Sequence, residues 1–343
     1  MDRIGVLLID GSPSEEWLSG ETDFLKLALT PFEEDRKGKN LETKDLIEAK
    51  VVELGNFNPS RNLADDTKVV VLANAEKLEE AQAEALLSFT LNGGGLWICH
   101  GDQVNAEWYN RSLGPDGSNL LPLQLRNLGG SLTDDSIRTR VVAAHFDHPA
   151  LSLFNDPRNG NLADADVWRW QRLEEPQDLM EKETTILARF ETGDPFLAER
   201  KIGKGLVMQM STSADGDWNN FPVRACFLPL IQQIASYLAN QVTPPRNLPT
   251  GSTITHYLPE SKAGSSVEIL CPNGSIVQSR AVRRGSQSVV EFPNTRQPGV
   301  YQISGSEFGP IKFVANASPS ESILGRIDRE EIRERLASLT AVS

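Results

Sequence analysis

Cysteine is scarce in this sequence, which has only Cys99, Cys226 and Cys271 among its 343 residues. An odd number of widely spaced cysteines builds neither a disulfide framework nor the ligand set of a zinc site. Cys226 and Cys271 are therefore expected to serve as small hydrophobic residues.

Long apolar runs and an excess of basic residues are also missing. No stretch approaches the length of a membrane span. The chain carries 34 basic and 47 acidic residues, a net charge of −13. From residue 244 onward there are 11 basic and 9 acidic residues, so residues 1–243 hold 23 basic and 38 acidic ones. Such an acidic region repels phosphate backbones, which argues against a nucleic-acid partner.

The four histidines include one close pair, His145 and His148, with Asp147 between them. A pair at this spacing with an acid is suited to zinc binding or to acid–base chemistry. No third ligand follows at a matching spacing, so a turn ahead of Pro149 is the favoured role. We expect neither a metal nor another cofactor.

Residues 1–243 alternate strand and helix patterns. Apolar runs predict strands at Ile4–Ile9, Ala49–Leu54, Lys68–Leu72, Leu96–Ile98, Thr185–Phe190, Pro195–Arg200 and Leu206–Met210. Helical spacing predicts helices at Thr22–Leu29, Glu76–Leu91 and Phe227–Ala239, with a long irregular insertion at 106–165. This alternation predicts an α/β domain with a doubly wound, mostly parallel, flavodoxin-like sheet. A core strand that begins almost at residue 1, without a signal peptide, favours a piece excised from a longer protein.

A change of pattern follows in the last hundred residues. Residues 244–250 are rich in proline and predict a linker. Residues 251–316 carry short alternating strands with turn signals between them, which predicts a small immunoglobulin-like β-sandwich. Residues 317–343 are charged and predict a C-terminal helix or tail.

The most informative stretch is GGGLWICHGDQ at 93–103. A short buried strand leads into Cys99, His100 and Gly101, and this is how an α/β sheet presents a nucleophile at the carboxyl edge of its strands. A thiol at Cys99 can attack a carbonyl if a base such as His100 keeps it as a thiolate. The alternative is a cysteine that caps a buried strand, with His100 on the opposite side of that strand.

Other polar residues follow predicted strands and are candidates to line a ligand crevice. Asp10 and Ser12 follow the first strand, Gly101 and Asp102 follow Cys99, and Asp215 and Trp218 follow the last strand. For Asp10 the alternative is a turn that caps the next helix. For Asp215 it is a solvated loop, and for Trp218 it is core packing rather than an aromatic wall for a sugar or peptide.

Residues 97–103 resemble the nucleophile elbow of the class I glutamine amidotransferase-like superfamily, written Gly-x-Cys-x-Gly-x-Gln. Cys99, Gly101 and Gln103 stand in register, and Trp97 replaces the first glycine. The family activates its thiol with a His-x-Glu pair after a late strand. Here Ser211, Thr212 and Ser213 follow that strand, so the resemblance implies the fold without the activating pair.

The same region is similar to the trehalose-utilisation (ThuA-like) branch of that superfamily. Three segments carry the similarity: GGGLWICH ending at His100, His148-Pro149-Ala150-Leu151, and Gly203-Lys204-Gly205 with the strand after it. The resemblance covers most of residues 1–243. It implies that His100 and His148 belong to the family's conserved pattern, and we add His148 to the candidate binding residues.

The overall layout resembles the soluble part of bacterial membrane proteins of the aerotolerance (Bat) type. The segments DGDW at 215–218, PGVY at 298–301 and Ala315-Asn316-Ala317 carry this likeness. Such proteins join an amidotransferase-like domain to a membrane-anchored von Willebrand factor A region. The likeness implies an extracytoplasmic location, with membrane-spanning segments outside this chain.

Two functions from different classes follow. The first is a non-catalytic binding or scaffold module of a larger bacterial envelope protein, with a small molecule or a protein as partner. The second is a cysteine-dependent glutamine amidotransferase or amidohydrolase that uses Cys99. An imidazole nitrogen within hydrogen-bond reach of the Cys99 sulfur would favour the enzyme, and a buried sulfur among aliphatic groups would favour the module.

Overall fold

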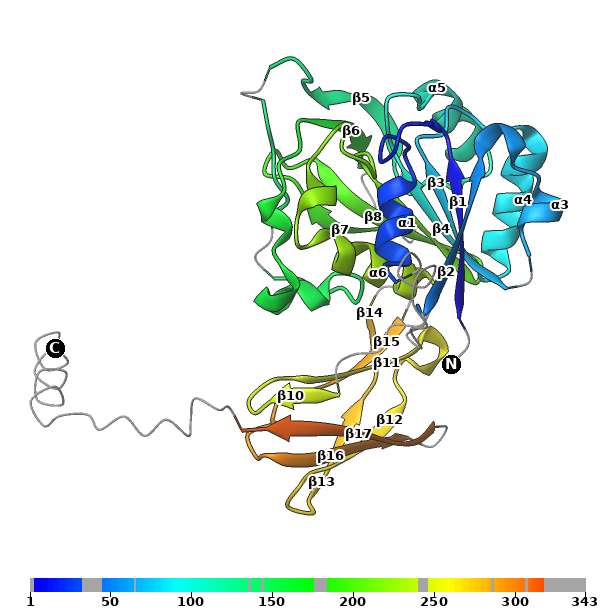
Figure 1. Ribbon diagram of the computed structural model, residues 1–343. Helices are drawn as coiled ribbons and strands as arrows, with labels where there is room; N and C mark the ends of the chain where they lie inside the picture. Colours follow the sequence, from blue (N-terminus) through cyan, green and yellow to red (C-terminus); the bar gives the residue numbers. More distant parts are fainter. Residues whose placement is uncertain are drawn as a thin grey trace, which may run out of the picture. The chain divides into compact units, whose positions relative to one another are not determined.

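The computed structural model describes residues 3–32, 45–64, 66–134, 137–142, 145–175, 184–239, 246–284, 287–305 and 308–317. The chain forms two compact units, Met1–Val242 and Thr243–Ser343. The first contains helices and strands, and the second is built from strands (Figure 1).

A seven-stranded sheet organises the first unit, and its first five strands are parallel. The order is β2 (Ile47–Glu53), β1 (Ile4–Asp10), β3 (Thr67–Ala73), β4 (Gly95–Cys99), β9 (Gly205–Met210), β8 (Pro195–Ile202) and β7 (Thr184–Arg189). The last two strands, β8 and β7, run antiparallel to their neighbours. Every residue of β4 and β9 is buried, as expected for parallel strands covered on both faces. The unit is thus a mixed α/β domain with a large, parallel-rich sheet.

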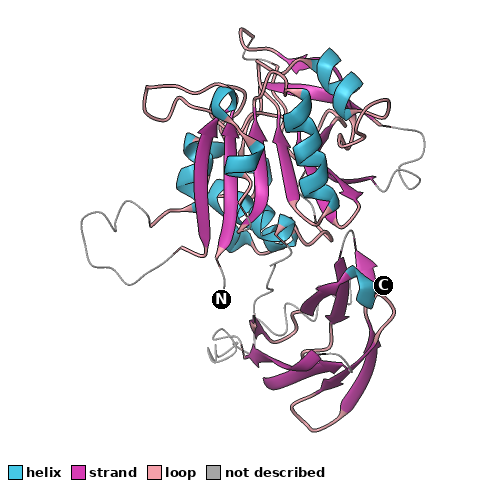
Figure 2. Cartoon of the chain, turned by 90° about the vertical axis from the view of Figure 1, so that its right-hand side faces the viewer, coloured by secondary structure: helices cyan, strands magenta, loops and turns pink. Residues whose placement is uncertain are grey.

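Helices cover both faces of this sheet (Figure 2). Helices α1 (Asp23–Leu29) and α6 (Phe227–Leu238) share one core cluster with side chains such as Val69 and Trp97. Helix α4 (Glu80–Leu91) packs into a second cluster with Val70 and Ile98. Successive residues of a strand alternate between the two clusters, because strand side chains point to opposite faces. The short helices α3 (Pro59–Asn62) and α5 (Ala106–Trp108) complete the unit.

Helix α4 begins four residues later than the apolar pattern predicts. Glu79 caps it, because Gln82 accepts a hydrogen bond from the Glu79 backbone N–H at 2.9 Å in a capping box. The sequence around residues 106–165 forms a five-residue π-helix at Tyr109–Leu113 and short 3₁₀ turns. Strand β5 (Gln124–Gly130) pairs with β6 (Arg169–Glu174) as a separate two-stranded antiparallel sheet.

The second unit is an all-β region of two sheets around one core. The larger sheet has the order β10 (Asn247–Pro249), β17 (Phe308–Asn316), β16 (Gly299–Gly305), β12 (Ser266–Leu270) and β13 (Ile276–Arg280). The smaller has the order β11 (Ile254–Pro259), β15 (Gln287–Phe292) and β14 (Val282–Arg284). Buried side chains from both sheets meet, among them Ile254, Val290, Ile303 and Phe313.

Part of the predicted linker 244–250 is a strand. Residues Asn247–Pro249 form β10, which pairs in parallel with β17, with Leu248 opposite Ala315. Pro249 is tolerated there because an edge strand leaves one row of backbone groups unpaired. Apart from Ala317, the predicted C-terminal helix or tail at 317–343 lies outside the described residues. Across the described ranges, no helix combines the length and the apolar character needed to cross a bilayer.

At Gly95, β4 lies close against the end of α6. A Cβ atom there would lie 2.6 Å from Leu238 Cβ and 2.8 Å from its carbonyl oxygen. We predict that Gly95→Ala lowers the free energy of unfolding by about 1–3 kcal/mol, because strand and helix must move apart. Urea denaturation measures the loss. Gly55→Ala is the matched control, since nothing lies within 4 Å of its added methyl group, and equal stability of the two variants would contradict the prediction.

Candidate functional site

Four parallel strands end at one edge of the large sheet. Their last residues are Asp10 in β1, Ala73 in β3, Cys99 in β4 and Met210 in β9. The order of the strands reverses between β1 and β3, because β1 is followed in the chain by β2 on one side and then by β3 on the other. Ligands of open α/β sheets bind at this kind of switch point, so we call Asp10, Glu21, Asn74, Asp102 and Gln103 the switch-point cluster.

Asn74 lies at the centre of the switch-point cluster and is fully buried. Its side-chain NH₂ donates to a carboxylate oxygen of Glu21 and, at 2.8 Å, to Asp102 Oδ1. Its Oδ1 accepts from the Gln103 backbone N–H at 2.9 Å. The backbone φ of Asn74 is +47°, a left-handed conformation that costs energy in a residue other than glycine. Asn74 therefore connects the loops that follow β1, β3 and β4.

Two glycines make room for Asn74. A Cβ atom on Gly11 would collide with the Asn74 carbonyl group, and one on Gly101 would collide with the Asn74 side-chain amide. Gly101, a candidate binding residue, is thus explained by a close approach between two loops. Larger residues at either position would separate the strand ends.

Glu21 is the most strongly perturbed acid of the switch-point cluster. It is 3% exposed, and its Oε2 has no hydrogen-bond partner among the described residues. Burial, followed by the nearby carboxylates of Asp215 and Asp10, raises the pKa of Glu21 from 4.5 to about 9. Glu21 therefore carries a proton at neutral pH, which lets several acids share one edge of the sheet.

Asp10 serves as an acceptor for the loop that follows it. Its Oδ2 accepts from the Thr22 hydroxyl at 2.7 Å, and its Oδ1 accepts from the Ser12 backbone N–H at 3.0 Å. Thr22 occupies the N-cap position of α1, but it makes no capping hydrogen bond because its hydroxyl is directed to Asp10. Asp10 thus forms a local turn and also contacts the residue that begins α1.

The thiol of Cys99 is closed off from solvent. The residue is 0% exposed and belongs to the core cluster under α1 and α6. Burial, and then the negative charge of Glu21, raise the pKa of the Cys99 thiol well above its ordinary value. All four histidines lie in the described part of the chain, and none of them hydrogen-bonds to Cys99.

His100 faces the opposite side of the sheet from Cys99. Its Nε2 lies 2.9 Å from Gln209 Nε2, and its ring meets Tyr109 at 6.0 Å between centroids. The Leu123 backbone N–H and carbonyl fix the orientation of the Gln209 amide, so the Gln209 NH₂ donates to His100. Burial lowers the pKa of His100 to about 3, which keeps the ring neutral. A neutral imidazole on the far face cannot stabilise a thiolate at Cys99.

His148 belongs to a separate buried network. Its Nδ1 accepts from the Ala150 backbone N–H at 3.3 Å, which leaves the proton on Nε2 to donate to Glu199 Oε1 at 3.2 Å. The Tyr237 hydroxyl donates to Glu199 Oε2 at 2.9 Å. These contacts join the loop after residue 145 to β8 and α6. His148 therefore ties elements together, and its hydrogen bonds do not include any residue of the switch-point cluster.

Asp215 and Trp218 lie in the loop between β9 and α6. Asp215 is buried, and its Oδ1 accepts from the Asp217 backbone N–H at 3.0 Å, while burial raises its pKa. Trp218 is also buried, and its carbonyl accepts from the Trp168 backbone N–H at 3.0 Å. The charge of Asp215 helps to raise the pKa of Glu21, so we include Asp215 in the switch-point cluster. Trp218 instead anchors the loop against β6 and its neighbours.

Sequence reasoning missed three residues that carry most of the polar contacts: Glu21, Asn74 and Glu199. Asn74 lies two residues after the predicted strand Lys68–Leu72, and that position alone could have marked it as a candidate. Glu199 lies inside a predicted apolar strand, where a charged residue signals a buried partner. Glu21 has no local signal, because only the packing of its loop against Asn74 gives it a role.

Comparison with known families and proteins gives sparse matches. Residues 246–312 match a family model described as Domain of unknown function (DUF8816). No curated protein matches the chain. The matched residues lie within the second unit.

Solved structures resemble the chain at low sequence identity. A cytoplasmic protein of Salmonella typhimurium is 13% identical, with a TM-score of 0.49, over 68% of this chain and 98% of its own. A β-galactosidase from Bacillus circulans is 16% identical, with a TM-score of 0.45, over 84% of this chain and 41% of its own. A putative ThuA-like protein from Bacteroides uniformis is 13% identical, with a TM-score of 0.40, over 70% of this chain and 90% of its own. A ThuA-like protein is thus among the structures that the chain is similar to.

The raised pKa of Glu21 predicts a pH-dependent penalty on folding. Between pH values of about 4.5 and 9 the folded protein holds a proton that the unfolded chain has released, so stability falls as the pH rises. We expect Glu21→Gln to remove this dependence, so that its stability relative to the native protein rises by about 1.4 kcal/mol per pH unit between about pH 5 and pH 8. Urea denaturation across this range measures the gain. The exposed acid Glu16 provides the control variant Glu16→Gln, and parallel pH curves for native protein and Glu21→Gln would refute the prediction.

Proposed function

We propose that the first unit is a non-catalytic, amidotransferase-like binding or scaffold module. One observation carries the proposal: the Cys99 thiol is fully buried, with a raised pKa and no hydrogen bond from a histidine. A cysteine nucleophile reacts as the thiolate and must be reached by its substrate. Cys99 meets neither requirement.

The positions that replace the family's histidine support the same proposal. The Ser211 hydroxyl donates to the Phe196 carbonyl at 3.2 Å, and the Thr212 hydroxyl donates to the Arg169 carbonyl at 3.1 Å. The Ser213 hydroxyl accepts from the Trp218 backbone N–H at 3.3 Å. All three hydroxyl groups are thus engaged in holding backbone segments and do not supply a base.

The competing function is a cysteine-dependent glutamine amidotransferase or amidohydrolase. It is favoured by the place of Cys99 at the end of β4, beside the strongly perturbed Glu21 and the strained Asn74. Perturbed acids and strained backbones gather at functional sites. This function would require a rearrangement that exposes the thiol and brings a base to it.

We also propose a specific fold for each unit. The first unit has the doubly wound, flavodoxin-like, class I glutamine amidotransferase-like fold, and the second is an immunoglobulin-like sandwich. The strand order and the two facing sheets support these assignments. The Bat-type context, with an extracytoplasmic location and membrane-spanning segments outside this chain, is carried only by the layout of the sequence.

Thiol labelling of the folded protein tests the proposal. We expect a disulfide reagent to modify Cys271 rapidly, because it is partly exposed, and to reach Cys99 and Cys226 only on unfolding. We also expect no release of ammonia from glutamine. The Cys271→Ser variant is the control and should lose the rapid phase. Rapid labelling of Cys99, or glutaminase activity that disappears in Cys99→Ala, would establish the competing function instead.

A further inference from the structure

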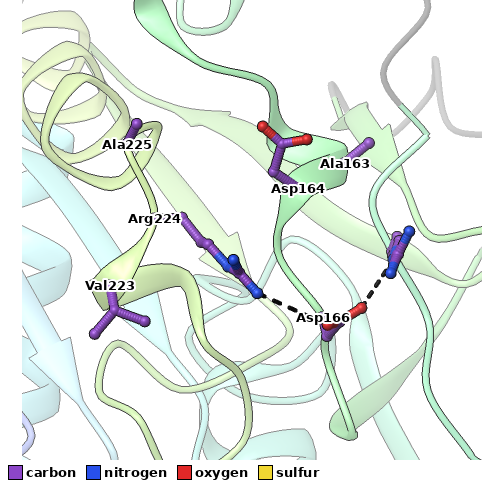
Figure 3. A pocket seen from close by; sticks show the side chains of 7 residues that line it. Ala163, Asp164, Asp166, Val223, Arg224 and Ala225 are labelled. Atoms are coloured by element: carbon purple, nitrogen blue, oxygen red, sulfur yellow. Dashed lines mark hydrogen bonds and ion pairs between the residues drawn. The ribbon is translucent and has the colours of Figure 1, made fainter.

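A cavity of about 490 Å³ opens in the first unit beside the residues that lead into α6. Its charged lining consists of Arg140, Arg224, Asp164 and Asp166. Figure 3 shows Arg224 extending toward Asp166, with Val223 and Ala225 on the same segment and Asp164 on the facing one. None of these residues belongs to the switch-point cluster.

Asp166 anchors three arginines. Arg140 Nε donates to Asp166 Oδ1 at 2.8 Å, and the side chains of Arg138 and Arg224 each lie 3.9 Å from Oδ2. The Asp166 side chain is only 16% exposed. The hydrogen bond from Arg140, more than the other two arginines, holds the pKa of Asp166 below its usual range. Asp166 is therefore ionised and fixes the position of the guanidinium groups.

Hydrogen bonds hold the backbone around Asp166 to two other segments of the chain, one at Asn220 and one at Thr139. Asp166 N–H donates to Asn220 Oδ1 at 2.8 Å, and Asn220 N–H donates to the Asp166 carbonyl at 3.1 Å. Thr139, which separates the two neighbouring arginines, pairs with Val167 through backbone hydrogen bonds of 2.8 and 2.9 Å. Arg138 and Arg140 thus project from one face of an extended segment. The arginines are placed before any ligand arrives, which reduces the cost of binding.

The Arg224 side chain has one polar contact in the described part of the chain, its 3.9 Å ion pair with Asp166. A guanidinium group has five N–H donors. The Nε of Arg224 is buried without a partner there, but the side chain as a whole is 39% exposed. An acceptor group that enters the cavity would therefore meet the exposed end of the guanidinium. The planar fork of the guanidinium matches a carboxylate.

The charges around the cavity favour a single negative charge on the ligand. In addition to the hydrogen bond from Arg140, the charges of three arginines, Arg140, Arg138 and Arg224, lower the pKa of Asp166. After the hydrogen bond to Asp166, the negative charges of Glu191 and Asp164 help to raise the pKa of Arg140. The three arginines are balanced by the three acids, so a ligand with one negative charge disturbs this balance less than a ligand with two. Ala163, Val223 and Ala225 add small apolar side chains to the lining. Helix α6 adds the positive end of its dipole, because its first turn has no acidic residue and its N-cap has no side-chain hydrogen bond.

From this arrangement we propose that the cavity binds a small aliphatic monocarboxylate, with the carboxylate on Arg224 and Arg140 and the apolar part against Ala163, Val223 and Ala225. The site is independent of Cys99 and of whether the first unit is catalytic.

Propionate is the probe, added to the full chain with ¹⁵N-labelled backbone amides. We expect saturable shifts of the Ala163, Asp164 and Ala225 amides, with a dissociation constant on the order of millimolar, as expected for so small a ligand. Arg224→Gln should weaken binding about tenfold or more, because the charge-assisted hydrogen bonds are lost. Arg158→Gln should leave binding unchanged, since Arg158 pairs with Asp156 outside the cavity.

Two further variants separate binding from folding. Asp164→Asn should tighten propionate binding several-fold, because it removes a repelling charge while Arg224 stays in place. Cys99→Ala should bind propionate like the native protein. The proposal is overturned if propionate produces no saturable shift, if Arg224→Gln folds and binds as tightly as the native chain, or if Asp164→Asn binds more weakly. Inorganic phosphate that binds more tightly than propionate would overturn the choice of a monocarboxylate.

Discussion

The hydrogen bonds of the Asn74 side chain hold the carboxyl edge of the large sheet together. One amide group links Glu21 in the loop after β1 to Asp102 and Gln103 in the loop after β4. Its left-handed backbone and the two glycines beside it are consequences of this close packing. This arrangement favours a neutral Glu21, because burial and the nearby carboxylates of Asp215 and Asp10 raise the pKa of its side chain. The protonation of one buried acid is thus part of the fold.

The two charged regions of the first unit differ in what they offer a ligand. In the switch-point cluster the donors and acceptors are largely paired with one another, and the thiol beneath them is sealed. At the cavity beside α6, Asp166 contacts three guanidinium groups, and the Nε of Arg224 has no hydrogen-bond partner in the described part of the chain. The switch-point cluster is thus largely occupied by its own contacts, whereas the cavity leaves one arginine less constrained.

The sequence predicted the architecture well where burial is uniform. Strands β3, β4 and β9 are buried on both faces, so they appear as short apolar runs. The sequence names Asp10, Asp102 and Asp215 as candidates because each follows a predicted strand. Glu21 and Arg224 could not be found in this way, since their environments arise from loops packed against residues distant in the chain. The start of α4 and the strand β10 were missed because they depend on a side-chain cap and on pairing with β17.

The pairing of β10 with β17 has a mechanical consequence. These are the first and last strands of the second unit, and they are parallel neighbours, with Asn247 opposite Val314 and Pro249 opposite Asn316. Tension applied across the unit would pull β10 from its start and β17 from its end, in opposite directions along the same axis. All the hydrogen bonds between the two strands would then bear the load together in shear, rather than opening one after another. Since forced rupture is governed by the barrier to unfolding, this geometry raises the force needed to break the unit open.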